Sequence, residues 1–339
     1  MRLNEIISRL ENKFPKSNAE SWDNVGLMVG NKEREIKKIQ ISLDVTMKVI
    51  DNAVENGVDL IISHHPFIFS PLKEINTDSL MGRKLMKVIE NKIAVYSLHT
   101  NLDSTLMGLN DLVGERLGFG QSKIIDAVKE SFYKGEVYAL TSENSEKIKE
   151  ELAKENISFK QENIGEQEKN IFKFTFAEKK EKIYSVIEKL NRKSLITKDY
   201  CIYELENKYT ESGIGRVYTL SEKQKLTDLI KNVKELLGLE VVTVSGYDID
   251  KAAIKKVALV NGAGSSYWKK AKRMGAELLI TGDLKYHEAL DAKEEGIYIL
   301  DVGHYESEHF FHLLIEKILE KETGLEYFVF NDEPVLKKY

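Results

Sequence analysis

The chain is poor in several features that would mark a special class of protein. Its 339 residues include a single cysteine, Cys201, which excludes an internal disulfide framework and fits a reducing compartment. No apolar run approaches the ~20 residues of a membrane span. The first ten residues have helical spacing of apolar side chains and are too polar for a signal peptide. These absences predict a soluble, cytoplasmic protein with no membrane partner.

The chain also lacks a net positive charge. The formal net charge is −5, whereas proteins that bind nucleic acid backbones in general are mostly basic. A local basic patch stays open, but the sequence has no base-reading motif. We therefore do not expect nucleic acid as a partner.

Two parts of the chain alternate strand-like and helix-like runs. In residues 1–125, strands are expected over 38–44, 58–63 and 93–99, and helices over 47–56 and 81–91. The same rhythm returns in residues 209–339, with strands over 257–260, 277–280 and 297–300 and helices over 265–274 and 285–295. Such alternation predicts an α/β core with a mainly parallel sheet that helices cover on both faces. The length suits two domains better than one.

Residues 126–208 show a different pattern. Strands are expected over 134–140, near Phe159, and over 170–177 and 199–206, with helices over 145–155 and 182–190. This β-α-β-β-α-β order is the ferredoxin-like pattern. The segment is rich in Lys and Glu and lacks clustered histidine or glycine signatures. It is expected to be an inserted structural or assembly module.

Two adjacent histidines at the end of a strand-like run carry the strongest chemical signal. The apolar run Leu60–Ile62 predicts a buried strand, which His64 and His65 follow and Pro66 stops. Open α/β sheets place ligands at such ends. Adjacent side chains diverge, so they chelate one small ion poorly but can serve two ions that share a bridging group. The alternative is one metal ligand with a hydrogen-bonded neighbour.

A second strand-like run ends at His99, and Asp103 follows on the next loop. Asp103 offers the hard oxygen that a hydrolytic metal site needs, although a lone loop aspartate is usually a turn former or cap. His99 suits a metal ligand, a group that orients a ligand, or a proton shuttle.

The third cluster follows the strand expected over 297–300. Gly303 turns the chain, and the apolar spacing of the residues after it predicts a helix that carries His304 and Glu308 on one face of its first turn. The Glu308 carboxylate has two oxygens and can bridge two ions, whereas Glu306 points elsewhere. A simple cap with a solvated pair is the alternative. His309 and His312 are expected to be packing or surface residues.

Together these motifs resemble a known family. The segments that carry the resemblance are Ser21-Trp22-Asp23-Asn24-Val25-Gly26-Leu27, Ser63-His64-His65-Pro66, His99-Thr100-Asn101-Leu102-Asp103, Gly282-Asp283-Leu284-Lys285-Tyr286-His287-Glu288-Ala289 and Gly303-His304-Tyr305-Glu306-Ser307-Glu308. They run in order from near residue 21 to residue 308. The chain resembles the Nif-three-like family, whose members are often labelled GTP cyclohydrolase I type 2 homologues.

The resemblance implies a Nif-three-like α/β core with a dinuclear metal centre, and often a toroidal homohexamer. It maps metal ligands onto His64, His65, Asp103, His304 and Glu308. It also implies an inserted ferredoxin-like domain in some relatives. Gly213-Ile214-Gly215-Arg216 is similar to the family's return to the core, which places the insertion at 126–208 and the discontinuous core at 1–125 and 209–339.

Three further motifs have open interpretations. Asn261-Gly-Ala-Gly-Ser-Ser266 follows a strand, and its backbone amides suit either a phosphate site or a plain tight turn. Asp283 and His287 suit proton transfer or support of a ligand, although Asp283 is also a good N-cap. Trp22 and Asn24 would either line the pocket or hold a loop.

Two classes of function remain. Imidazole and carboxylate ligands suit two divalent ions of Zn, Fe, Mn or Ni, and the first class is a metal-dependent hydrolase acting on a nucleotide or other phosphorylated metabolite. In this class Glu308 bridges the ions, and His99 transfers protons. The second class is a non-enzymatic metal-binding regulator or chaperone scaffold.

Overall fold

The computed structural model describes residues 1–127, 132–165, 170–205, 212–321 and 324–337. The chain forms two compact units, one of Met1–Val128 with Glu211–Tyr339 and the other of Lys129–Thr210. No helix in the described ranges is both long enough and apolar enough to cross a bilayer.

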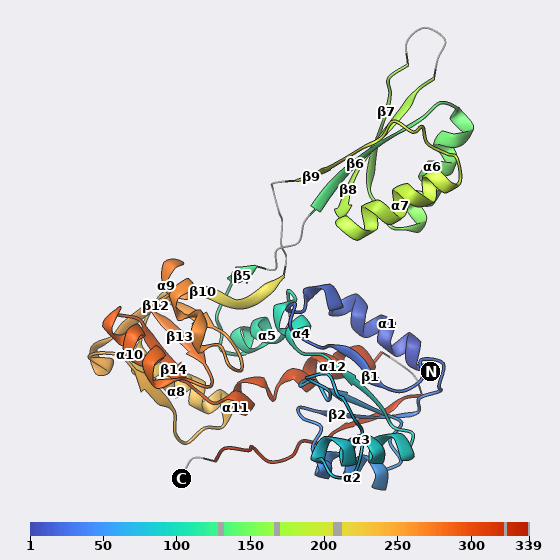
Figure 1. The fold of residues 1–339 in the computed structure, drawn as a ribbon. Coiled ribbons are helices and arrows are strands. Elements are labelled where there is room, and N and C mark those ends of the chain that lie inside the picture. Colours follow the sequence, from blue (N-terminus) through green and yellow to red (C-terminus); the bar gives the residue numbers. More distant parts are fainter. Residues whose placement is uncertain (128–131, 166–169, 206–211, 322–323, 338–339) are drawn as a thin grey trace. The chain divides into compact units, whose positions relative to one another are not determined.

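The larger unit contains a five-stranded sheet built mostly from its N-terminal half (Figure 1). Its strands, in spatial order, are β1 (Gly26–Val29), β4 (Ala94–Ser97), β3 (Leu60–Ser63), β2 (Lys38–Ser42) and β15 (Glu326–Val329). The pairs from β4 to β15 are parallel, and β1 is antiparallel at one edge.

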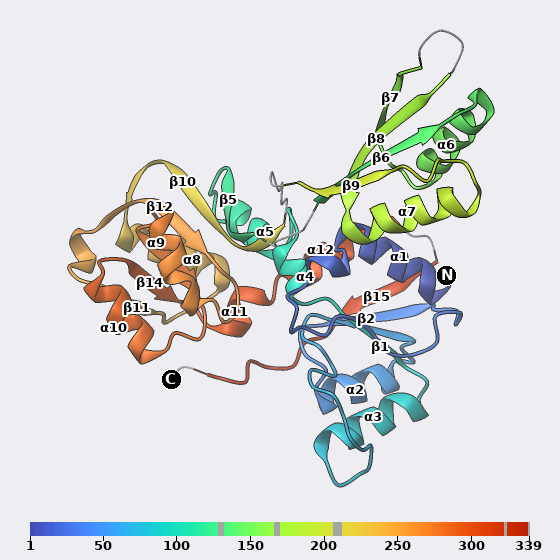
Figure 2. The same ribbon diagram turned by 45° about the horizontal axis from the view of Figure 1, so that its top comes forward.

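Helices cover both faces of this sheet (Figure 1, Figure 2). They are α1 (Leu3–Lys13) and α12 (Phe311–Leu319) on one face, and α2 (Met47–Glu55) and α3 (Leu80–Glu90) on the other. Sequence explains α2 locally, because the side chain of Thr46 caps it and Val49, Ile50 and Ala53 give it one buried stripe.

A six-stranded sheet forms the rest of the unit. Its strands are β11 (Thr243–Ser245), β14 (Tyr298–Asp301), β13 (Leu278–Thr281), β12 (Ala253–Leu259), β10 (Gly213–Lys225) and β5 (Ser122–Ala127). Its helices are α8 (Leu226–Leu237), α9 (Trp268–Arg273) and α10 (Tyr286–Glu294). Only β12, β13 and β14 pair in parallel. One hydrophobic cluster joins the two sheets, with Ile41 and Ile62 from the first and Leu259 and Ile280 from the second.

We expected a mainly parallel sheet, and the structure corrects this in part. The core has two sheets, and the second has more antiparallel than parallel pairs. The reason is the pairing of the long strand β10 with both β5 and β12, which local periodicity does not reveal.

Short elements complete the larger unit. They are α4 (Thr100–Ser104), α5 (Leu109–Arg116) and α11 (His304–Glu308), with 3-10 turns η1 (Lys16–Asn18), η2 (Ile249–Lys251) and η3 (Ser265–Tyr267). Asp103, expected on a loop, lies in α4.

The smaller unit has its own core. Its elements are β6 (Phe132–Ala139), α6 (Ser142–Lys154), β7 (Phe159–Asn163), β8 (Phe172–Lys179), α7 (Lys180–Arg192) and β9 (Cys201–Glu204). The sheet has the antiparallel order β7-β8-β6-β9, and both helices contribute to its hydrophobic core. The strand expected over 199–206 is observed as β9, and its expected end at Glu206 lies outside the described residues, as does the expected boundary at 208.

Candidate metal centre

The carboxyl ends of three parallel strands bring the first group of polar side chains together. Strands β2, β3 and β4 end in register at Ser42, Ser63 and Ser97. Just beyond these serines the chain places Asp44, then His64 with His65, and then His99. Because the strands are parallel neighbours, these side chains gather at one edge of the first sheet.

The second sheet contributes from the corresponding edge. Beyond its parallel strands β12, β13 and β14 lie Gly262, Asp283 and the helix α11. This helix begins at His304 and ends at Glu308, so the two side chains are one turn apart, with 3.1 Å between His304 Nε2 and Glu308 Oε2. The two edges meet at the site, where His65 Nε2 lies 2.9 Å from Glu308 Oε2.

Six of the side chains singled out in the sequence meet at this place. Their ligand atoms form three groups, each within 4.8 Å: His64, Asp103 and Glu308; His65, His304 and Glu308; His64, His65 and His99. Glu308 belongs to the first two groups. Its Oε1 lies 3.6 Å from His64 Nε2, and its Oε2 faces the other two imidazoles.

Each histidine of these groups has its Nδ1 atom held by an oxygen outside the centre, at 2.8–2.9 Å. The pairs are His64 with the Leu98 carbonyl, His65 with Asp44, His99 with Asp23 and His304 with Asp283. Such partners fix the ring orientation and leave Nε2 as the nitrogen that can bind a metal ion, as is usual for metal-binding histidines.

Two buried polar atoms at the centre have no hydrogen-bond partner among the described residues. They are His64 Nε2 and Asp103 Oδ1, and 3.8 Å separates them. Both residues are at least nine-tenths buried. An unsatisfied buried nitrogen and oxygen cost free energy unless another group binds them. The residues present therefore fit a metal ion.

The electrostatics of the centre depend on Glu308. Burial would raise its pKa, but the neighbouring imidazoles, with His64 first, hold the pKa of this carboxyl well below its usual range. The hydrogen bond that His304 donates to Glu308 raises the pKa of His304 to about 9. Burial lowers the pKa of His65, yet Asp44 and Glu308 together raise it to about 10.

The two deeper residues shift the other way. Burial lowers the pKa of His64, and burial followed by the charge of Glu308 raises the pKa of Asp103 well above its usual value. Without metal, therefore, protons occupy part of the donor set, and a metal ion must displace them.

Glycine is required where the second sheet touches the carboxylate. Gly262 has φ +62°, and a Cβ there would lie 2.1 Å from Glu308 Oε1 and 3.4 Å from His304 Nε2. Its amide donates to Ser307 Oγ.

The motif around this glycine fits a tight turn better than a phosphate site. Asn261 N donates to Asn110 Oδ1, and Gly264 N donates to Thr281 Oγ1. Three of the loop's amides are thus used inside the protein, which favours the tight turn over the anion cradle.

Other expectations about Asp283 and His287 need correction. Asp283 supports His304 but does not cap a helix, because α10 begins at Tyr286 with Lys285 in the N-cap position. Asp283 instead has φ +54°, outside any helix. His287 is exposed on α10 and belongs to none of the donor groups.

Trp22 and Asn24 have separate roles. The Trp22 ring lies 6.1 Å from the His99 ring, so Trp22 borders the site, while Asn24 holds a loop by donating to the Ile68 carbonyl. His309 and His312 lie outside the donor groups, with the Glu306 carbonyl and the Glu316 carboxylate as partners.

Sequence reasoning missed the roles of two aspartates. Asp44 ends a strand-like run with no histidine beside it, and Asp23 appeared only within a family motif. Asp23 also accepts hydrogen bonds from Thr100 N and Oγ1, which ties the start of α4 to His99. The signal for Asp44 was its position after a strand parallel to the one that precedes His64.

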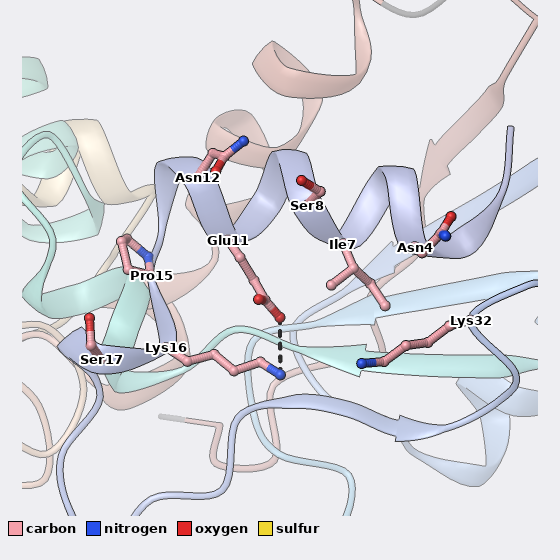
Figure 3. A pocket seen from close by; sticks show the side chains of 9 residues that line it. All are labelled: Asn4, Ile7, Ser8, Glu11, Asn12, Pro15, Lys16, Ser17 and Lys32. Carbon is pink, nitrogen blue, oxygen red and sulfur yellow. Dashed lines mark ion pairs between the residues drawn. The ribbon is translucent and has the colours of Figure 1, made fainter. Parts of the chain in front are cut away.

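Two cavities in the larger unit differ in whether they contain the expected site residues. One of about 610 Å³ opens onto His65 and His304. Another of about 450 Å³ lies along α1, where Lys16 and Glu11 form an ion pair of 3.0 Å (Figure 3). The second cavity contains none of the expected site residues, so the first is the one that serves the centre.

Comparison with known proteins identifies the family of the chain. Residues 1–334 match the family model described as Duf34/NIF3 (NGG1p interacting factor 3). The chain belongs to the NIF3 family. It is 34% identical to the "GTP cyclohydrolase 1 type 2 homolog" of Clostridium perfringens over 91% of the chain and 87% of the relative. A Bacillus subtilis protein of the same name is also 34% identical, over 89% and 87%.

Two solved structures have the same fold as this chain. A Bacillus cereus protein related to NIF3 superposes with a TM-score of 0.78 at 29% identity, covering 96% of each chain. Staphylococcus aureus protein SA1388 superposes with a TM-score of 0.82 at 26% identity, covering 100% of this chain and 99% of its own.

Proposed function

We propose that this NIF3 protein holds two divalent metal ions. His64, Asp103 and Glu308 would bind one ion, His65, His304 and Glu308 the other, and Glu308 would bridge them. The observation that carries this proposal is the pair of unsatisfied buried atoms, His64 Nε2 and Asp103 Oδ1, beside a carboxylate that faces three imidazoles. The mixed nitrogen and oxygen donors suit Zn, Fe, Mn or Ni.

We further propose that the protein is a metal-dependent hydrolase. When bound, a pair of such ions lowers the pKa of water and polarises an electrophile. The side chains of the protein would orient the substrate and exchange protons with it. His99, with its Nδ1 held by Asp23 and its ring packed beside His64 and His65, is the proton-transfer candidate. A metal site without a cavity would favour the regulator, so the 610 Å³ cavity supports the enzyme.

The relatives' names support a nucleotide or another phosphorylated metabolite as the substrate class. For the smaller unit, we propose an inserted ferredoxin-like domain. Its β-α-β-β-α-β order and strand sequence β7-β8-β6-β9 support this. A homohexamer and a cytoplasmic location remain predictions from the resemblance and composition.

The first test is metal content. Protein purified without chelators should contain about two transition-metal ions per chain. Only trace metal, with none taken up on addition, would contradict the centre. Replacing residues 126–208 with a short linker should leave the metal content unchanged if the smaller unit is a separate module.

The second test is turnover. The metal-loaded protein is screened against phosphorylated metabolites, and Glu308→Gln is compared with Glu294→Gln on the exposed end of α10. The first variant should lose activity and at least one ion, and the second should keep both. His99→Ala should keep most metal and still slow turnover. If no substrate reacts with both metals confirmed, the regulator becomes the better proposal.

A further inference from the structure

The cavity at the candidate metal centre is lined by negatively charged side chains. Four carboxylates line it, from Asp44, Asp283, Asp301 and Glu306. In the described part of the chain, no lysine or arginine is among its lining residues. Lys84 of α3 interacts electrostatically with Asp44 but does not line the cavity.

Some of these carboxylate oxygens are already committed. Asp44 Oδ1 and Asp283 Oδ2 each hold an imidazole, and the two oxygens of Asp301 accept from the amides of Leu284 and Gly303. Glu306 is different, because its carboxylate has no hydrogen-bond partner among the residues that the structure describes. It folds back over Gly303, where a Cβ would lie 2.1 Å from Glu306 Oε2. Free acceptors therefore remain on the cavity wall.

Metal ions would not reverse this charge. Two divalent ions bring four positive charges, while coordinated imidazoles are neutral. The carboxylates that hold or surround them are more numerous: Asp23, Asp44, Asp103, Asp283, Asp301, Glu306 and Glu308. The wall beyond the ions thus keeps a negative potential, which repels anions and attracts groups with N–H donors.

Part of the remaining wall is apolar. Leu43, Leu284 and the exposed pair Val335 and Leu336 contribute aliphatic surface. The segment that carries this pair is fastened just before it, because Asn331 Oδ1 accepts from Leu43 N and Asp332 Oδ2 accepts from Thr46 Oγ1. An entering group would therefore meet both hydrocarbon and hydrogen-bond acceptors.

We infer that the part of the substrate that enters this cavity is uncharged or cationic, has N–H donors on an apolar body, and carries no phosphate. This inference rests on the proposed function and deepens it. If the substrate is a nucleotide or another phosphorylated molecule, its phosphates stay outside, and its nitrogen-bearing end faces His65 and His304.

Two matched probes test the inference on the metal-loaded, full-length protein. Both have the same metal-binding hydroxamate head and a tail of similar length. 6-Aminohexanohydroxamic acid has a cationic tail, and adipic acid monohydroxamate has an anionic one. Calorimetric titration at low ionic strength should give at least about tenfold tighter binding of the cationic probe, and added salt should reduce the ratio.

Two variants test whether the carboxylates of the cavity wall cause the difference in affinity between the probes. Glu306→Gln should lower the ratio of the two affinities, because it removes the charge of the one wall carboxylate without a hydrogen-bond partner in the described part of the chain. Glu235→Gln, on the exposed face of α8, should leave the ratio unchanged. Both variants should bind the same amount of metal as the wild type.

The outcomes separate the two proposals. Equal binding of the probes, or tighter binding of the anionic one, would overturn the charge inference and leave the metal centre intact. If neither probe binds protein that holds two ions, the open catalytic centre and the charge inference both fail. A Glu306→Gln variant with the wild-type ratio would also reject the assignment to this wall.

Discussion

Substituting Gly262 with alanine tests the candidate centre without removing any donor. The new Cβ would lie 2.1 Å from Glu308 Oε1 and 3.0 Å from its Cδ, far inside normal contact distance. Glu308 would have to move by about 1 Å, whereas a metal site tolerates only ~0.2 Å in its ligand distances. We therefore expect Gly262→Ala to lose one or both ions while the protein stays folded.

The backbone cost of this change can be measured separately. Gly57 has the same φ of +62°, and a Cβ there would meet nothing within 4 Å. Gly57→Ala thus carries the same left-handed strain, about 1–2 kcal/mol, without the contact. For a unit of this size, the melting temperature should fall by roughly 2 °C for each kcal/mol.

Metal analysis and thermal unfolding should be run on both variants. We expect both to melt a few degrees below the wild type, but only Gly262→Ala to lose metal. If Gly262→Ala retains two ions with unchanged affinity, Glu308 is not a ligand in the observed position, and the bridging assignment fails.

Three further predictions follow from the same structure. Asp283→Asn should weaken metal binding about 10–100-fold, because it removes the negative charge of the carboxylate that orients His304. Asp291→Asn on exposed α10 should not weaken it, and metal competition assays with a chelating dye decide this. Metal affinity should rise with pH between about 6 and 9, because the ions must displace protons from His65, with a pKa of about 10, and from His304, with a pKa of about 9. Calorimetry in two buffers should detect the released protons. An affinity that does not change with pH would contradict this prediction. Arg216→Met should lower the free energy of unfolding by roughly 3–5 kcal/mol, because it removes a buried guanidinium that pairs with Asp111 and donates to the carbonyls of Gly213, Gly215 and Thr105. Denaturant titration giving a loss of less than about 1 kcal/mol would refute this.

The local parts of the site could be predicted from sequence. Strand-like runs that stop at His64 and His99, and a helix that starts at His304, placed these side chains at sheet edges because parallel strands share an edge. The helical offset from His304 to Glu308 is likewise local and appears in the structure as a 3.1 Å contact.

Long-range pairing could not be predicted in the same way. Strand β15 pairs with β2, nearly 290 residues earlier in the chain, and β10 pairs with β5 across the smaller unit's sequence. The hydrophobic pattern of each strand does not indicate which strand it pairs with. For the same reason the contact of Asp44 with His65 was missed, since it depends on which strand lies beside β3.

The division of donors along the chain has a consequence for biosynthesis. His64, His65, His99 and Asp103 are translated early, but His304 and Glu308 follow only after some 200 more residues, and β15, which completes the first sheet, comes later still. A ribosome-bound N-terminal segment would therefore expose four of the six donors without the proposed bridging carboxylate. If the proposed centre binds metal, capture of the ions would wait until the chain is almost finished. The ions would then bind the completed protein and would not guide the folding of its first half.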